Sequence, residues 1–302
     1  MSEALNTCFT VSDRHAYLIL AHHEFEVLAY LVAALDDSRN DIYIHYDKKL
    51  SHLPQISTQK AKLIILEKRI DVRWGDVSVV AAELLLFESA YLQGNYSYYH
   101  LLSGVDLPLY NQDYVHRFFK KREGKEFIGF SCGDQRKHIE RKVQRYHLFP
   151  NHFRGENTMI NFTRKGMRFL WLRMQLALGI KRNREIIFKK GTQWVSLTHN
   201  FVAYILTKKE ETLHRYRNTF CADEIVVQTL CWNSPFREAI YDLQNEAEGS
   251  QRMIQWIDNQ IYDWELKDFS KLISSDLLFA RKFNSQSSEL LNKLADHING
   301  SK

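Results

Sequence analysis

The sequence predicts a layered α/β fold, and three observations support this prediction. Short apolar runs typical of strands alternate, over the first 130 residues, with longer segments whose apolar residues recur at the helical period. With 302 residues, 45% of them hydrophobic, the chain is long enough to bury a large core. It has four prolines and no linker rich in serine and glycine. We therefore expect one domain over 1–302 with a mixed sheet flanked by helices.

Five strands are expected, each an apolar run that ends near a polar or turn-forming residue. They cover 16–21, 42–45, 62–66, 98–102 and 126–130. Helices fit 24–35 and 77–92, because apolar residues there follow the 3.6-residue period. After residue 130 the pattern loosens into charged and aromatic segments. Further helices are expected there over 199–208, 224–232 and 286–298, as C-terminal elaborations of the domain.

Two aspartates stand where apolar runs end. Asp106 follows a run that is stopped by Ser103 and Gly104, and Pro108 keeps that strand from continuing. Asp47 closes a second run, over 41–47. Since ligands of open α/β sheets bind at the carboxyl ends of the strands, we expect both carboxylates to lie close to a ligand.

The segment 164–190 is strongly basic, with nine lysines and arginines against one acid, Glu185. Its apolar residues recur at helical spacing: Met167, Leu170, Trp171, Met174 and Leu178. Two interpretations follow from an apolar face with cationic flanks. The simpler is an amphipathic helix packed on the core, and the other is a helix that docks on an anionic membrane surface or an anionic acceptor.

Cysteine usage and the N-terminal residues bear on location. The four cysteines are widely scattered and form no CxxC pair, which argues against a disulfide framework or a zinc site: Cys8, Cys132, Cys221 and Cys231. Residues 1–11 lack the pattern of a secretory leader, and no run of 18 uncharged apolar residues occurs. We therefore expect a cytoplasmic protein.

Several classes of site are absent from the sequence. It contains no glycine-rich phosphate loop of the GxxxxGK[ST] or GxGxxG type and no GxSxG elbow. His22 and His23 are donors that suit a metal, but adjacent strand residues point to opposite faces. The Asp-x-Asp pair that holds a divalent cation against a diphosphate is also missing. A diphosphate would therefore have to be neutralised by side-chain cations.

The last third of the chain offers such cations. Arg281 and Lys282 stand between aromatic and apolar residues, and Arg252 also lies in an apolar context, an arrangement that suits a partly buried anion. Alternatively, the first two cap a helix or make surface pairs. Asp223 is placed like a helix N-cap, which leaves Glu224 as a partner of the helix dipole or as a general base at the mouth of a cleft.

Seven segments resemble, in this order, the motifs of core-2/I-branching β-1,6-N-acetylglucosaminyltransferases and peptide O-xylosyltransferases, which form glycosyltransferase family 14. They are AYLILAHH at 16–23, IHYDKK at 44–49, WG at 74–75, SGVDLPL at 103–109, GTQWVSL at 191–197, ADE at 222–224 and LFARKF at 278–283. The resemblance implies a GT-A-type fold with a Rossmann-like mixed sheet. Its nucleotide-binding half would cover about 15–130, its acceptor and catalytic half about 131–284, and a C-terminal helix 285–302.

The resemblance also implies an inverting transfer from a UDP-sugar, with no metal ion and no other cofactor. Glu224 matches the catalytic base of the family, and Lys282 matches a lysine that contacts the donor pyrophosphate. The other residues that it implicates are Arg252 and Arg281 at the pyrophosphate, His22 and Asp47 at the nucleotide, and Asp106, Trp194 and Asp223 near the donor sugar or the acceptor.

Two departures from the family shape the expected biology. Animal members carry a membrane anchor and a cysteine-rich stem, and this chain shows neither. It therefore resembles a bacterial relative that builds surface polysaccharide on a glycan or lipid-linked glycan acceptor. The segment 164–190 would then contact the anionic inner face of the membrane. GlcNAc is the first guess for the transferred sugar.

Two other classes of function stay open. A metal-dependent hydrolase would use the histidines and aspartates near 22–47 as ligands. A noncatalytic module that binds carbohydrate or nucleotide would explain the 15 tyrosines and 18 phenylalanines. Nucleic acid is not expected as a partner, because no nucleic-acid-binding motif accompanies the basic segment.

Overall fold

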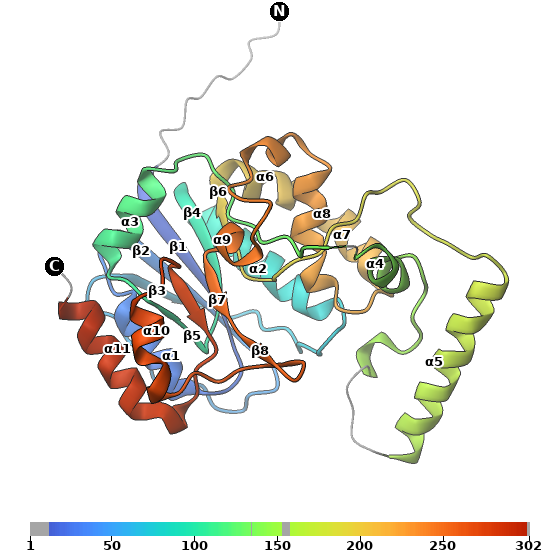
Figure 1. Cartoon of the computed structure of the whole chain (residues 1–302), viewed down its shortest axis with the longest axis horizontal. Coiled ribbons are helices and arrows are strands. Elements are labelled where there is room, and N and C mark those ends of the chain that lie inside the picture. The colour runs from blue at the N-terminus through green and yellow to red at the C-terminus, as the bar shows by residue number, and fades with distance from the viewer. Residues whose placement is uncertain (1–11, 134, 153–157, 301–302) are drawn as a thin grey trace, which may run out of the picture.

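A five-stranded sheet forms the centre of the computed structural model, which describes residues 12–133, 135–152 and 158–300 (Figure 1). The strand order is β3-β2-β1-β4-β6, with the first four strands parallel and β6 antiparallel to β4. The strands are β1 (Ser12–Ala21), β2 (Asn40–Tyr46), β3 (Lys62–Ile65), β4 (Tyr96–Ser103) and β6 (Ser196–Thr198). The predicted α/β class, with a mixed sheet flanked by helices, is confirmed.

Side chains of β1 alternate between two cores, as the pleat of a strand requires. Tyr17 and Ile19 belong to the core on one face, whereas Ala16 and Leu18 belong to the core on the other. The first core is completed by α1 (Phe25–Ala34), α3 (Gln112–Lys120), α10 (Phe269–Ile273) and α11 (Ser288–Gly300). The second is completed by α2 (Ser78–Gln93), α4 (Arg136–Val143), α6 (His199–Thr207), α7 (Lys209–Tyr216) and α8 (Val226–Trp232).

A smaller sheet brings distant parts of the chain together. Its order is β5-β10-β7, formed by β5 (Asp106–Pro108), β10 (Phe279–Arg281) and β7 (Arg252–Ile254). Pro108 is the last residue of β5, as expected of a proline that ends a strand, and its missing N–H is tolerated because β5 is an edge strand of this sheet. A short pair, β8 (Trp256–Ile257) and β9 (Gln260–Ile261), completes the strands of the described residues.

The predicted strand over 126–130 is wrong. This run makes only isolated bridges, between Glu126 and Ile240 and between Phe127 and Ser196. Its apolar side chains are nevertheless buried, so the run of hydrophobic residues reports burial rather than a hydrogen-bonded ladder. The remaining helices of the described residues are α5 (Met159–Ala177), α9 (Glu246–Ser250) and short 3₁₀ turns over 150–152, 222–224, 235–239, 266–268 and 285–287.

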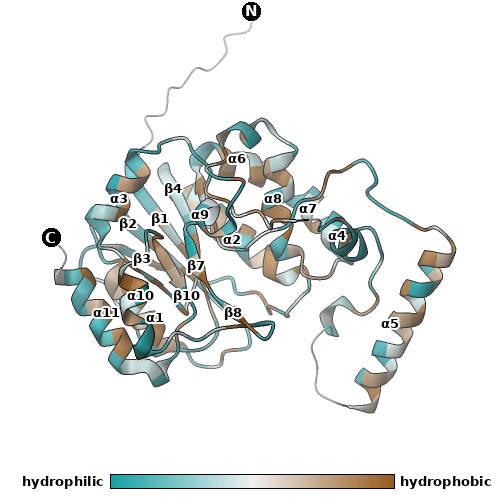
Figure 2. Cartoon of the chain, viewed as in Figure 1, coloured by the Kyte–Doolittle hydropathy of each residue, from teal (hydrophilic) through white to brown (hydrophobic). Residues whose placement is uncertain are grey.

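The helix α5 lies at the edge of the molecule, away from the central sheet (Figure 1). The simpler interpretation of this segment, a helix packed on the core, is wrong, because Gln175 is the one residue of α5 that is buried. Apolar residues recur along α5 (Figure 2), and many of their side chains are exposed. Across the described residues, no helix combines the length and the apolar character that crossing a membrane requires.

The cysteines that the structure describes are unpaired. Cys132 is exposed, whereas Cys221 and Cys231 are buried. Cys8 and the rest of residues 1–11, on which the expected absence of a leader rests, lie outside the described residues.

Candidate active site

The carboxyl ends of β1 and β4 meet the smaller sheet at a buried ion pair. Asp106 is 1% exposed and accepts a hydrogen bond from the Ser103 N–H at 2.8 Å. It also forms an ion pair with Arg281, whose Nη1 lies 2.8 Å from its Oδ1. Burial raises the pKa of Asp106, and the Arg281 guanidinium opposes that rise. The interpretation of Arg281 as a helix cap is therefore wrong, because this residue ends β10 opposite Asp106.

Two residues predicted to line a nucleotide pocket lie next to this pair. Asp47, 5% exposed, binds Lys49 Nζ at 2.8 Å, and its backbone N–H donates to the Ala21 carbonyl at the end of β1. His22 follows Ala21. Burial and, to a lesser extent, the neighbouring His23 lower the pKa of His22 to about 4, against the opposing effect of Asp47. The neutral imidazole and the carboxylate thus lie at the same edge of the sheet.

Lys282 provides an accessible cation beside these groups. Its Nζ lies 3.1 Å from Asp263 Oδ2, and its side chain is 32% exposed. Burial is the main cause that lowers the pKa of His23, and hydrogen bonds from Ser285 are the main cause that lowers that of Glu24, at the start of α1. The positive charge of Lys282 adds to both effects. Because Asp263 is itself 38% exposed, this pair is open to solvent and to an anionic ligand.

Arg252 occupies a different environment from the one expected of a pyrophosphate-binding cation. It is 2% exposed, and its guanidinium lies 4.3 Å from the centre of the Phe279 ring. It donates hydrogen bonds to the carbonyls of Ser250 and Val195 and to Ser196 Oγ. These contacts tie β7 to β6, so Arg252 is held inside the structure.

Trp194 lies beneath the ion pair of the smaller sheet. Its side chain is 7% exposed, and the Arg281 guanidinium lies 4.4 Å from the centre of its ring. A guanidinium held over an indole is a favourable cation–π contact that also fixes the orientation of the arginine. Trp194 thus supports Arg281 from below.

Glu224 is the centre of a second charged group. Its Oε2 lies 3.0 Å from Lys142 Nζ and 3.3 Å from Lys190 Nζ, and its side chain is 32% exposed. Burial alone would raise the pKa of Glu224, but the two lysines outweigh that effect and hold the pKa below its ordinary value. Glu224 is therefore an ionised carboxylate at neutral pH with one face open to solvent.

The neighbouring Asp223 has the opposite character. Burial and the charge of Glu224 raise the pKa of Asp223 to about 6, and its Oδ1 has no hydrogen-bond partner among the described residues. The predicted helix N-cap is wrong, because the residues that precede the 3₁₀ turn and α8 are Cys221 and Ile225. On α2, the fully buried Glu83 accepts a hydrogen bond from Gln193 Nε2, and burial and Asp223 raise its pKa.

The segment 191–194 connects the two charged groups. The Gly191 N–H donates to the Glu224 carbonyl at 2.9 Å. Three residues later, the Trp194 ring makes the cation–π contact with Arg281. A Cβ at position 191 would lie 1.8 Å from the Gly129 oxygen, so this close approach requires glycine. The motif at 191–197 therefore positions both ends of the candidate site.

Sequence reasoning did not find the lysine partners of Glu224 as such. Lys142 lies in α4, which contains several lysines and arginines, and nothing in the sequence distinguishes Lys142 from the others. Lys190 was counted within the basic segment, but its partner lies 34 positions away in the chain. Within the described residues, no group of three histidine, cysteine, aspartate or glutamate side chains gathers in a way that could hold a metal ion.

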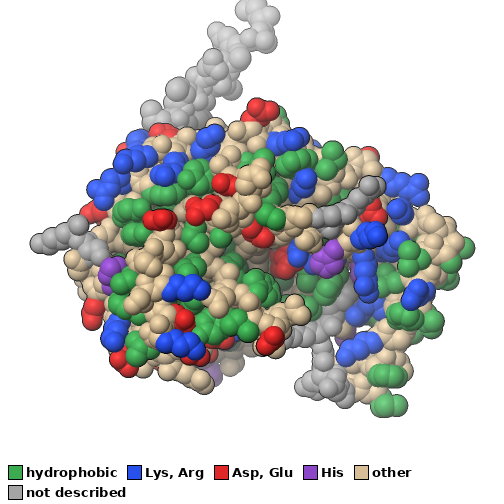
Figure 3. All heavy atoms as spheres, in the orientation of Figure 1, with side chains coloured by type: hydrophobic (Ala, Val, Ile, Leu, Met, Phe, Trp, Pro, Cys, Tyr) green, Lys and Arg blue, Asp and Glu red, His purple; other side chains and the backbone are tan. Residues whose placement is uncertain are grey.

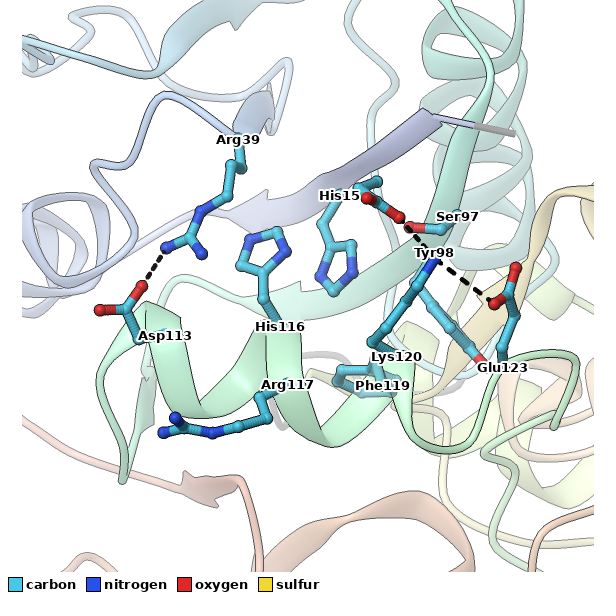
Figure 4. A pocket seen from close by; sticks show the side chains of 11 residues that line it. His15, Arg39, Ser97, Tyr98, Asp113, His116, Arg117, Phe119, Lys120 and Glu123 are labelled. Carbon is cyan, nitrogen blue, oxygen red and sulfur yellow. Dashed lines mark hydrogen bonds and ion pairs between the residues drawn. The ribbon is translucent and has the colours of Figure 1, made fainter. Parts of the chain in front are cut away.

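A cavity of about 400 Å³ lies at the opposite, amino-terminal end of the sheet. It is lined by β1, β4 and α3, and His15 and His116 stack within it with their ring centres 3.9 Å apart (Figure 4). Burial lowers the pKa of both histidines, to about 4 for His116. Neither Glu224 nor Lys282 lines this cavity.

Curated proteins similar to this chain are xylosyltransferases of mammals. The xylosyltransferases 2 of dog and human are each 23% identical over 314 residues, which cover 95% of this chain. The chain spans about a third of the length of these relatives, since the alignment covers 34% of each. Mouse xyloside xylosyltransferase 1 superposes with a TM-score of 0.38 and 8% identity, over 90% of this chain and 99% of that one.

A family model also matches most of the chain. The model described as Core-2/I-Branching enzyme matches residues 15–275, a range that includes Asp47, Asp106 and Glu224 and ends before Lys282. It covers the central sheet, α5 and the 3₁₀ turn that carries Glu224. The chain therefore belongs to the Core-2/I-Branching enzyme family of glycosyltransferases.

Proposed function

We propose that this protein transfers a sugar from a UDP-sugar to a hydroxyl of a glycan or lipid-linked glycan, with inversion at the anomeric carbon and without a metal ion. The acceptor oxygen forms a bond to the anomeric carbon while the bond from that carbon to the diphosphate breaks. The acceptor proton passes to a carboxylate, and UDP leaves with the bonding electron pair. The reaction thus needs a base on one side of the sugar and cations on the other.

The observation that carries the proposal is the environment of Glu224. Two lysines keep its carboxylate ionised, and the side chain remains 32% exposed, so it can accept a proton from a substrate hydroxyl. Once Glu224 is protonated, the same lysines favour loss of the proton to solvent, which returns the base to its starting state. Glu224 is therefore our assignment for the base.

Lys282 and Arg281 are our assignment for stabilisation of the leaving diphosphate. Lys282 is paired with a half-exposed aspartate and can exchange it for a phosphate. Arg281 is already bound to Asp106, and its Nε has no partner among the described residues. Fixed cations aimed at a developing charge supply the stabilisation that a divalent ion gives other enzymes. Arg252, being buried, positions the strands beneath them.

His22 and Asp47 would then contact the nucleotide, while Asp106, Trp194 and Asp223 support the groups that face the donor sugar and the acceptor. GlcNAc stays the first guess for the transferred sugar because of the resemblance to β-1,6-N-acetylglucosaminyltransferases, whereas the relatives named xylosyltransferase favour xylose. A bacterial, cytoplasmic role in surface polysaccharide synthesis stays part of the proposal.

The test is sugar transfer and UDP release from a panel of UDP-sugars, with and without excess EDTA. The Glu224→Gln variant is compared with Glu211→Gln, because Glu211 is also held by two cations, Arg215 at 2.6 Å and Lys208 at 3.5 Å. We expect EDTA-resistant turnover of one donor, a loss of about 10²–10⁴-fold in Glu224→Gln, and unchanged turnover in Glu211→Gln.

Other outcomes would contradict the proposal. Turnover abolished by EDTA and restored by a divalent ion would favour metal chemistry, as in a hydrolase. Tight UDP binding with no turnover across a panel of donors and glycan acceptors would favour a binding module. Full activity of Glu224→Gln under conditions where chemistry limits the rate would remove Glu224 from the role of base.

A further inference from the structure

The helix α5 presents its apolar side to solvent. Its most exposed apolar side chains, with their exposed fractions, are Met159 (81%), Phe162 (74%), Leu170 (67%), Ile160 (63%), Phe169 (56%) and Leu176 (54%). At 100° per residue, five of these six lie on one half of the helix. A helix of a soluble protein normally turns such a face toward its core. Here that face has no partner within the described residues.

The orientation of α5 is fixed by its opposite face. Arg168 donates hydrogen bonds to the carbonyls of Leu148 at 3.1 Å and His152 at 3.2 Å, and the Gln175 side chain bonds both backbone groups of Tyr146. Polar side chains thus bind the rest of the chain, while apolar ones point away. This reversal holds the apolar face in an exposed position.

The charge of the segment indicates what covers that face. Residues 158–184 contain seven lysines and arginines and no acid. Lys165 and Arg173 are exposed on α5, and Arg184 is exposed just after it. Figure 3 shows blue cationic side chains interspersed with green hydrophobic ones over this edge of the molecule. A partner that fits this face therefore has an anionic surface, which attracts the lysines and arginines, and an apolar interior, which receives the hydrophobic side chains.

We propose that α5 docks in the plane of an anionic lipid bilayer, with Phe162, Phe169 and Leu170 entering the boundary between headgroups and acyl chains. Exposed aromatic and aliphatic side chains flanked by lysine and arginine are the features of an interfacial helix. A second copy of this chain fits less well, because a two-fold contact would place the same cations against one another.

Docking would also orient the candidate active site. Arg182, which follows α5, donates a hydrogen bond to the Val143 carbonyl at the end of α4. That helix carries Lys142, the partner of Glu224. A docked α5 would hold the Glu224 end of the site close to the bilayer, within reach of a lipid-linked acceptor. This consequence rests on the proposed function, whereas the docking itself does not.

The test is cosedimentation of the full chain with phosphatidylcholine vesicles, with and without phosphatidylglycerol, at low and high salt. We expect binding to the anionic vesicles that weakens with salt. Lys165→Ala with Arg173→Ala should weaken it about 25-fold, at roughly fivefold per cation near the surface. The matched control is Lys68→Ala with Lys121→Ala, two lysines exposed elsewhere.

An apolar pair of variants completes the test. Phe162→Glu with Phe169→Glu should abolish binding, whereas Leu92→Glu with Leu243→Glu, at residues 77% and 42% exposed, should leave it intact. All four positions are exposed, so the thermal unfolding of the variants should match that of the native protein. No binding to anionic vesicles, or equal binding by the Phe162→Glu/Phe169→Glu protein, would overturn the proposal. A native dimer that this variant converts to monomer, without vesicle binding, would assign the face to self-association.

Neither arm of this experiment requires a sugar donor. In the native protein, vesicle binding without turnover would therefore contradict the proposed function alone, and turnover without vesicle binding would contradict the docking alone.

Discussion

The two ends of the central sheet differ in how their charges are satisfied. At the amino end, the cavity is bordered by complete pairs, with Arg39 bound to Asp113 at 2.7 Å and Lys120 to Asp13 at 2.8 Å. At the carboxyl end, Asp223 Oδ1 and Arg281 Nε are buried without partners among the described residues. Buried polar atoms without partners are uncommon and call for an explanation. The difference indicates that buried polar atoms without hydrogen-bond partners, more than hollow volume, mark the candidate active site.

The ionisation behaviour of the two ends also differs. Burial keeps the histidines of the amino end neutral, since it lowers the pKa of His15 and His116. At the carboxyl end, two neighbouring acids have separated pKa values, since the pKa of Asp223 is raised to about 6 while that of Glu224 is lowered. Pairs of acids with separated pKa values are typical of catalytic sites, whereas uniformly neutral groups are typical of a packed core.

The largest effect on stability is expected at the buried ion pair. Arg281→Ala leaves the Asp106 carboxylate, 1% exposed, without its cation. We expect a loss of about 3–5 kcal/mol in the free energy of unfolding, measured by urea denaturation. At the amino end, Lys120→Ala breaks an exposed pair and should cost less than about 1 kcal/mol.

A second variant separates the charge from the packing. Asp106→Asn with Arg281→Met removes both charges and should recover part of the stability lost in Arg281→Ala. If Arg281→Ala cost no more than Lys120→Ala, the contrast between a buried ion pair at the carboxyl end and an exposed one at the amino end would fail.

The next effect is the acid sensitivity of the amino end. Burial and Arg39 lower the pKa of His116 to about 4, so the folded protein binds a proton here less readily than the unfolded chain, whose pKa is near 6.5. Stability is therefore full above pH 6.5 and falls as the pH drops toward 4, by about 2 kcal/mol between about pH 8 and pH 5.

His116→Gln should flatten this dependence in urea denaturation at the two pH values, although His15 continues to contribute in the same direction. The catalytic rate should stay unchanged, since His116 lies at the end of the sheet away from Glu224. A variant that retains the full dependence on pH would show that His116 does not titrate as described.

The smallest effect concerns the tuning of the base. Lys142 lies 3.0 Å from Glu224 and is 8% exposed, so Lys142→Met keeps most of the volume while removing one positive charge. The pKa of Glu224 should rise, and the acidic limb of the pH–rate profile should move to higher pH, with a rate change of only severalfold at neutral pH.

Lys190→Met should move the limb in the same direction, because Lys190 also lowers the pKa of Glu224. Lys293→Met, at a lysine paired with Glu289 on α11, is the matched control and should not move it. An unmoved limb in both lysine variants would mean that Glu224 does not set it.

Much of the fold followed from local patterns. The apolar runs of β1, β2 and β4 predict strands, because a strand of a parallel sheet is covered on both faces and therefore has few polar residues. The run over 126–130 has the same composition but packs without a ladder, and composition cannot distinguish the two. For α5, the period predicts the helix, while the outward direction of its apolar face depends on distant contacts such as that of Arg168 with Leu148.

The candidate site was predictable where one segment contains its chemistry. Asp106 was found from the end of its strand, and its partner Arg281 from an aromatic and cationic motif 175 positions later. Their pairing depends on the register of β5 with β10, which no local pattern encodes. The burial of Arg252 was missed for a similar reason, because an arginine in an apolar segment has the same sequence whether its head faces solvent or backbone carbonyls.

The most direct test is a calorimetric titration of UDP into the protein in excess EDTA, with one variant from each end of the sheet. Lys282→Ala changes the carboxyl end, and Arg117→Ala changes a residue that lines the amino-end cavity. We expect the native protein and Arg117→Ala to bind UDP equally, and Lys282→Ala to bind it about 10- to 100-fold more weakly, as loss of a hydrogen bond to a charged group requires. Weaker binding in Arg117→Ala, with unchanged binding in Lys282→Ala, would place the nucleotide in the cavity and contradict the assignment of the active site.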